Sequence, residues 1–169
     1  MNIIKGIYVL VISASKGIKV NVGALDILNF ERGLYAYVGS VGSAQNNLEK
    51  RIMRHLRKAK RRIWHIDYLL ENEFASVARV FYKKAKRPEE CKIARKLSKM
   101  SIPVVDFGCS DCGCVSHLFM VNGSDESRSS MAFLERTLRA QGMHNLGMVY
   151  SNASIALSSS NPNQLIARR

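Results

Sequence analysis

The sequence predicts an α/β (α+β) fold in a single domain. Segments with strand-like apolar patterns are interleaved with segments whose apolar residues recur every three or four positions, as in helices. The 169 residues suffice for a buried core without disulfides. The hydrophobic content of 47% is ordinary for a soluble globular chain.

Three strands are expected in the first part of the chain. Residues 5–13 carry apolar side chains on both faces, so we expect both faces to be covered. A short turn then leads to residues 18–22, which we interpret as the returning strand of a hairpin. Residues 34–39 form another strand that places Tyr35 and Tyr37 on one face.

A basic helix is expected over residues 46–59. Its Leu48, Ile52 and Leu56 are four positions apart and form one apolar stripe. A shorter helix over residues 64–71 follows.

The second half continues the alternation of strands and helices. A strand over residues 75–82 precedes a helix over residues 89–99, for which a proline suits the first turn. A strand over residues 118–121 is followed by a C-terminal helix over residues 125–140, which a serine can cap and a glycine ends.

The domain is expected to comprise residues 1–142. Residues 143–169 are interpreted as a Ser/Asn-rich, poorly ordered tail, because they show little periodicity. No apolar run approaches the roughly 20 residues that span a bilayer. The first residues lack the charged region of a signal peptide. We therefore expect a cytoplasmic protein without a membrane partner.

The charge of the chain indicates a polyanionic partner. Lys and Arg total 26 against 13 Asp and Glu, a formal net charge of +13, and much of the excess lies in residues 50–62 and 83–99. Such clusters mark nucleic-acid surfaces, although a solvated helix face is the alternative. Neither stretch has the apolar face of a membrane anchor. The candidate nucleic-acid-binding residues are Lys50, Arg54, Arg57, Lys58, Lys60, Arg61 and Arg62.

Two tripeptides carry the most specific signal. Gly6-Ile7-Tyr8 and Tyr37-Val38-Gly39 precede Arg51 and His55. In this order they resemble the GIY-YIG nuclease superfamily, and in particular a poorly characterised prokaryotic branch that also occurs fused to endonuclease-III-type DNA glycosylases. Further motifs similar to that branch lie at residues 35–40, 48–52, 54–57, 64–70, 90–91 and 110–119.

The resemblance implies a small, mainly antiparallel sheet flanked by helices, here with added strands and a C-terminal helix. It also implies phosphodiester cleavage assisted by one divalent metal, Mg²⁺ or Mn²⁺. By motif position, Tyr8 helps to activate the attacking water, with Tyr37 beside it, and Arg51 steadies the phosphate. His55 assists, and Glu90 is our choice for the metal-binding glutamate.

Each of these residues also has a simpler structural interpretation. The tyrosines could be core strand residues with bonded hydroxyls, and Arg51 one basic residue among many. Glu90 is in line with Ala94 and Leu97 and so borders the buried face of the helix. A carboxylate there needs a hydrogen-bonding or metal partner, because burying an unpaired charge is costly. A first-turn glutamate is, however, favoured by the helix dipole alone.

A Cys/His run forms a second candidate site. In a cytosolic protein, thiols and an imidazole this close suggest zinc rather than disulfides. The alternatives are buried free thiols, or a pocket for an unknown, thiol-based chemistry. Cys91 is most simply a core residue. The four residues of the run are Cys109, Cys112, Cys114 and His117.

The expected function is therefore metal-dependent endonucleolytic cleavage of DNA. The alternatives are a non-catalytic nucleic-acid-binding module on the same scaffold, and a Cys/His-site protein of unknown chemistry. A DNA-repair protein partner is suggested only by the glycosylase fusions in similar proteins.

Overall fold

A computed structural model describes residues 5–42, 47–121, 127–151 and 154–157. Within these residues, six strands form the main sheet in the order β6-β7-β4-β1-β5-β8, and neighbouring strands are antiparallel. The predicted mixed α+β class is confirmed. The strands are β1 (Gly6–Ala14), β4 (Gly33–Val41), β5 (Ala75–Lys83), β6 (Ile102–Pro103), β7 (Leu118–Val121) and β8 (His144–Asn145).

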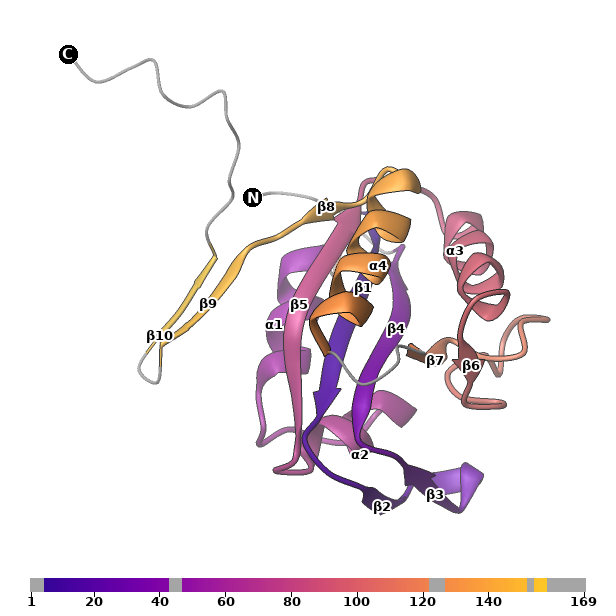
Figure 1. Cartoon of the computed structure of the whole chain (residues 1–169), viewed down its shortest axis with the longest axis vertical. Coiled ribbons are helices and arrows are strands. Elements are labelled where there is room, and N and C mark those ends of the chain that lie inside the picture. Colours follow the sequence, from indigo (N-terminus) through magenta and orange to yellow (C-terminus); the bar gives the residue numbers. More distant parts are fainter. Residues whose placement is uncertain (1–4, 43–46, 122–126, 152–153, 158–169) are drawn as a thin grey trace.

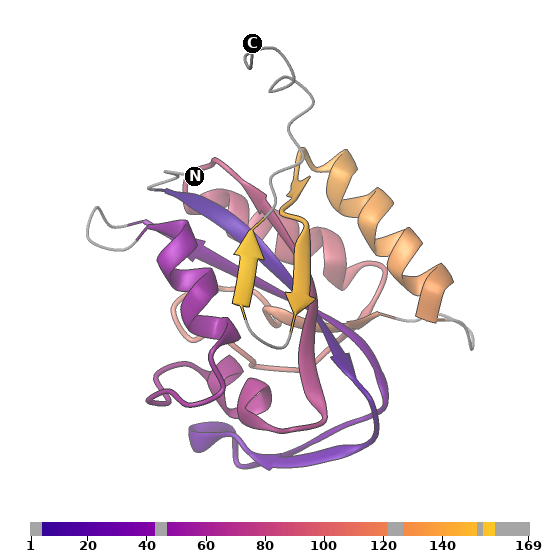
Figure 2. The same ribbon diagram turned by 90° about the vertical axis from the view of Figure 1, so that its left-hand side faces the viewer.

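Helices cover both faces of this sheet. On one side lie α1 (Leu48–Leu56) and α2 (His65–Glu71), and on the other α3 (Pro88–Ser98) and α4 (Ser127–Ala140). Figure 2 shows α1 and α4 on opposite sides of the sheet, with the strands between them. The result is three layers with the sheet in the middle (Figure 1).

Strand β1 is the centre of the core. Tyr8 and Leu10 belong to the apolar cluster beneath α1 and α2, whereas Ile7 and Val9 belong to the cluster beneath α3 and α4. All four side chains are buried. The prediction that both faces of this strand are covered is confirmed, because the two sets of alternating apolar residues each have a helical layer to pack against.

The expected hairpin between residues 5–13 and 18–22 is wrong. Strand β2 (Ile18–Asn21) pairs instead with β3 (Ile27–Phe30), and the two form a separate small sheet joined by a 3-10 turn, η1 (Gly23–Leu25). Both edges of β1 are occupied by β4 and β5. Residues 18–21 therefore find no free edge on β1.

Helix α1 ends at Leu56, three residues before the predicted end. Arg57 is already extended, at φ −71° and ψ 129°. The ammonium of Lys60 folds back and donates to the carbonyls of His55 and Arg57, at 2.7 and 2.8 Å. The last carbonyls of a helix receive no donor from within it, so the lysine satisfies them here.

Strands occur in the segment predicted to be a disordered tail. Strand β8 pairs with β5, and β9 (Met148–Ser151) forms a hairpin with β10 (Ser154–Leu157). Residues 158–169 of that segment, and the predicted helix start at 124–126, lie outside the described residues. Within the described part of the chain, no helix combines the length and the apolar character that a membrane crossing needs.

Candidate functional site

A cleft of about 920 Å³ opens where β1, β4, α1, α3 and the loop between β6 and β7 meet. Four residues predicted to be catalytic line it, namely Tyr8, Tyr37, Arg51 and Glu90. They come from four different elements, so only the tertiary fold brings them together. The fifth, His55, is buried behind Tyr8.

The position of Tyr8 depends on Gly39. The two residues are direct partners across β1 and β4, and a methyl group on Gly39 would overlap the ring of Tyr8. Tyr8 and Tyr37 lie on the same face, with ring centroids 6.4 Å apart. The glycine of the second tripeptide is thus required because the tyrosine of the first lies across it.

A buried histidine contacts the Tyr8 hydroxyl. Tyr8 Oη lies 2.8 Å from His55 Nε2. His55 Nδ1 lies 3.6 Å from Asp67 Oδ1, which is longer than a hydrogen bond, and it has no hydrogen-bond partner among the described residues. Burial lowers the pKa of His55, so the ring is neutral at neutral pH. In the tautomer that carries its proton on Nδ1, the side that faces the Asp67 carboxylate, Nε2 is free to accept from the Tyr8 hydroxyl.

Both cleft tyrosines are held in the phenol form. Burial, reinforced by the neighbouring Tyr37, raises the pKa of Tyr8 well above its usual value, and the guanidinium of Arg51 offsets only part of this. Burial and the nearby Glu90 raise the pKa of Tyr37 as well. Each hydroxyl is therefore a hydrogen-bond donor at neutral pH.

Helix α1 is joined to the start of α2 by stacking and by a buried carboxylate. The guanidinium groups of Arg51 and Arg54 each lie 4.3 Å from the ring centre of Trp64. Both oxygens of Asp67 accept from Arg54, at 3.0 and 2.9 Å. Asp67 also caps its own helix, accepting from the backbone N–H of Ile63 and Trp64. This framework fixes where Arg51 enters the cleft.

The predicted nucleic-acid-binding residues divide into two groups. The amine of Lys58 donates to three backbone carbonyls around the end of α2, and that of Lys60 caps α1. Arg54 pairs with Asp67, and Arg62 with Glu71. These four have structural partners. The side chains that are exposed and have no ion-pair partner among the described residues are those of Lys50, Arg57 and Arg61.

Glu90 connects the cleft to the Cys/His segment. Its side chain is 13% exposed. One oxygen accepts a hydrogen bond from the Ser40 hydroxyl, and the other lies 3.3 Å from His117 Nδ1. A partner for this carboxylate near the buried face was expected, and the structure provides two, Ser40 and His117. Ser40 was not among the predicted site residues.

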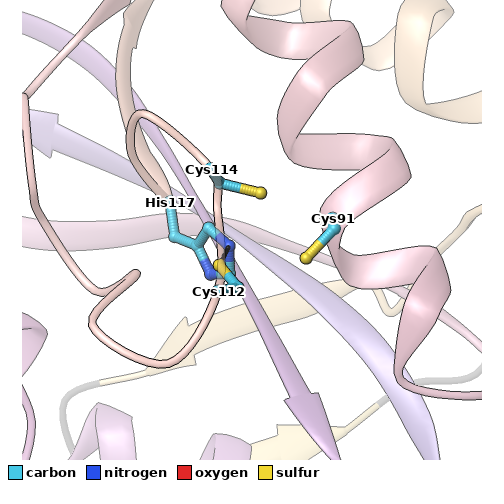
Figure 3. A group of neighbouring side chains, drawn as sticks. All are labelled: Cys91, Cys112, Cys114 and His117. Carbon is cyan, nitrogen blue, oxygen red and sulfur yellow. Dashed lines mark hydrogen bonds between the residues drawn. The ribbon is translucent and has the colours of Figure 1, made fainter.

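Four side chains could together hold a metal ion, and one of them differs from the predicted set. Ligand atoms of Cys91, Cys112, Cys114 and His117 all lie within 4.8 Å of one another. Figure 3 shows the Cys91 side chain directed from α3 toward the loop that carries the other three. Cys109, predicted as a ligand, is not a member; it is buried and begins the tight turn that Cys112 closes.

Cys91 was missed because it is distant in sequence from the Cys/His run. Its signals were its place beside Glu90 on one helix and the motif at residues 90–91, and both are equally consistent with a core residue. His65 also lines the cleft, and its Nδ1 accepts from the N–H of Gly108 at 3.2 Å.

A family model matches residues 7–140, which include every residue of the cleft described above except Lys5. Its description is a domain of unknown function, DUF123. No curated protein and no solved structure matches the chain. The match covers far more than half of the 169 residues, and the chain therefore belongs to the DUF123 family.

Proposed function

We propose that this protein is a metal-dependent endonuclease that cleaves phosphodiester bonds in DNA, with a GIY-YIG-type site. The supporting observation is that Tyr8, Tyr37, Arg51 and Glu90 line one cleft, as the superfamily pattern requires. The cleft is also basic at its rim, where Lys5 and Lys86 are exposed. A net charge of +13 favours a polyanionic substrate.

Tyr8 and His55 provide a path for the proton of the attacking water. With its raised pKa, Tyr8 is not a base by itself. It can take a proton on its oxygen only while passing its own proton to His55 Nε2, 2.8 Å away. The imidazolium formed in this way faces the Asp67 carboxylate, which stabilises the positive charge. The water oxygen then bonds to phosphorus as the bond to the leaving sugar oxygen breaks, and the leaving oxygen takes a proton from solvent water.

Arg51 binds the phosphate. Its guanidinium is held against the Trp64 ring, which leaves the planar fork of N–H groups available at the cleft. A fork of this kind binds two phosphate oxygens at once, and it stabilises the negative charge that grows on them in the transition state. The stacking also limits the side-chain entropy lost on binding.

Glu90 fits the role of ligand to a divalent metal. Mg²⁺ commonly takes one or two protein carboxylates and completes its shell with water and substrate phosphate oxygens. Each Glu90 oxygen has one hydrogen-bonding neighbour, Ser40 or His117, and so retains a free lone pair. When bound, Mg²⁺ or Mn²⁺ would supply charge stabilisation at the phosphate. This cleft ion is distinct from any ion at the Cys/His cluster, where thiolates favour zinc.

Nicking of supercoiled plasmid and of branched DNA tests the proposal. We expect cleavage with Mg²⁺ or Mn²⁺ and none with EDTA. Tyr8→Phe should lower the nicking rate by about 100-fold or more, the usual contribution of proton transfer. Tyr35→Phe is the matched control, because Tyr35 is on the same sheet face but its hydroxyl donates to the Glu31 carbonyl, outside the cleft.

Binding without cleavage is the competing function. Wild-type protein that binds DNA with steep salt dependence, yet nicks none of these substrates, would refute the nuclease and leave a nucleic-acid-binding module. Equal loss of cleavage in Tyr8→Phe and Tyr35→Phe would also count against the assigned site, because it would indicate a general effect on folding.

A further inference from the structure

Three thiols and one imidazole converge from two separate segments. Cys91 is in the first turns of α3, and the other three residues are in the loop between β6 and β7. Ligand atoms on one tetrahedral zinc are separated by roughly 3.5–3.8 Å, given Zn–N and Zn–S bonds of about 2.0 and 2.3 Å. The group lies within 4.8 Å, and Cys112 Sγ is 3.4 Å from His117 Nε2. A contraction of roughly one ångström at most would close the shell.

We propose that Cys91, Cys112, Cys114 and His117 form a structural zinc site. Four ligands with three soft sulfur donors match the closed, tetrahedral sites that zinc occupies in proteins. Binding displaces one proton from each thiol, and the resulting three thiolates and Zn²⁺ carry a net charge of −1. His117 binds through Nε2 as a neutral ring and keeps its proton on Nδ1.

The partner of that Nδ1 proton is Glu90. The His117 Nδ1 to Glu90 Oε1 distance is 3.3 Å, and metal-bound histidines commonly donate their other N–H to a carboxylate, which fixes the ring. Here the same carboxylate lines the cleft. The zinc would therefore hold Glu90 and the β6–β7 loop, which supplies Gly108 and Asp111 to the cleft wall. This effect on the cleft rests on the proposed function, whereas zinc binding does not.

The long irregular loop between β6 and β7 would be held in place by such an ion. Residues 104–117 contain no helix or strand, and Phe107 is their large buried apolar side chain. Val105 and Val115, by contrast, are 59% and 46% exposed. Tying Cys112, Cys114 and His117 to α3 would add a restraint to the part of the loop that follows the buried Phe107. The structural effect resembles that of zinc in small domains, where binding energy is folding energy.

Elemental analysis of the purified full chain tests the site without reference to nuclease activity. We expect about one zinc per chain in the wild type and in Cys109→Ser, the matched control whose cysteine is outside the cluster. Cys91→Ser should lose the metal. Titration of the metal-free wild type with Co²⁺ should produce the visible absorption of a tetrahedral thiolate complex. This second measurement does not depend on any variant folding.

Three results would overturn the proposal. The first is a wild-type chain that takes up neither zinc nor Co²⁺. The second is a thiol titration that finds cluster cysteines paired in a disulfide. The third is zinc that is retained in Cys91→Ser but lost in Cys109→Ser. Glu90→Ala should weaken zinc binding about 10–100-fold, measured by chelator competition. Zinc bound by a chain that never nicks DNA would refute the nuclease alone, and nicking by a chain without zinc would refute the zinc site alone.

Discussion

Replacing Asp67 with asparagine should destabilise the protein more than any comparable change of a surface carboxylate. The Asp67 side chain is fully buried. It accepts two hydrogen bonds from Arg54 and two from the backbone N–H groups of Ile63 and Trp64. An asparagine side chain at this position would have the same size but no charge, and one of its two terminal groups would be a donor rather than an acceptor.

The magnitude follows from these contacts. Whichever way the amide is oriented, its NH₂ group faces donors, either Arg54 alone or Arg54 with the two backbone groups. At least one hydrogen bond to a charged group is lost, which costs about 1.5–3 kcal/mol. Arg54 then lies partly buried without a counter-charge. Removing one partner of a buried pair typically costs about 3–5 kcal/mol in total, and we expect that range for Asp67→Asn.

The difference between wild type and Asp67→Asn should depend on pH. Burial raises the pKa of Asp67, but His55, the Arg54 guanidinium and the backbone N–H groups together outweigh it and hold the pKa far below its usual range. A depressed folded-state pKa stabilises the protein above the unfolded-state pKa of about 3.9. The advantage of the wild type should be full at neutral pH and shrink as the pH falls below about 5.

Urea unfolding monitored by circular dichroism measures the difference in the free energy of unfolding. Glu71→Gln is the matched control, on the same helix, because Glu71 pairs with Arg62 at the surface with 38% of its side chain exposed. Exposed pairs contribute about 1 kcal/mol or less. A cost for Asp67→Asn no larger than that for Glu71→Gln, or one that does not shrink in acid, would refute the reasoning.

Two further predictions concern the cleft and the basic helix. Gly39→Ala should cost about 1–3 kcal/mol of unfolding free energy and displace the Tyr8 ring. Gly42→Ala should be nearly neutral, because no atom of the described residues, its chain neighbours apart, lies within 4 Å of the added methyl. Equal unfolding midpoints for the two variants would contradict this. Lys58→Met should destabilise the fold by about 1–3 kcal/mol, since it leaves carbonyls without their donor. Lys50→Met should leave stability unchanged and, if the proposed substrate is correct, reduce the salt dependence of DNA binding by about one counterion. Loss of stability in Lys50→Met, with loss of salt dependence in Lys58→Met, would contradict the division of these basic residues into structural and DNA-binding groups.

Local patterns predicted the elements because the pattern and the element extend over the same few residues. Strand β7 was predicted with its bounds as observed, and the apolar stripe of α1 at Leu48 and Ile52 is buried. Strand β3 was not recognised, and its absence from the prediction led to the wrong partner for β2. Pairing partners depend on which strand edges are free, which no local pattern records.

By itself, the sequence determined the mixed fold class, the two-sided burial of β1 and the order of the tyrosine, arginine and glutamate motifs. Each of these depends on residue type and periodicity along a short segment. The tertiary structure alone decided that Lys58 and Lys60 serve as donors to backbone carbonyls rather than as free surface charges. It also decided that Cys91, not Cys109, joins Cys112, Cys114 and His117. The physical reason is the same in both cases. The packing of α2 and α3 against distant segments sets which groups come into contact. A buried backbone carbonyl is then paired with a donor that this packing brings within reach.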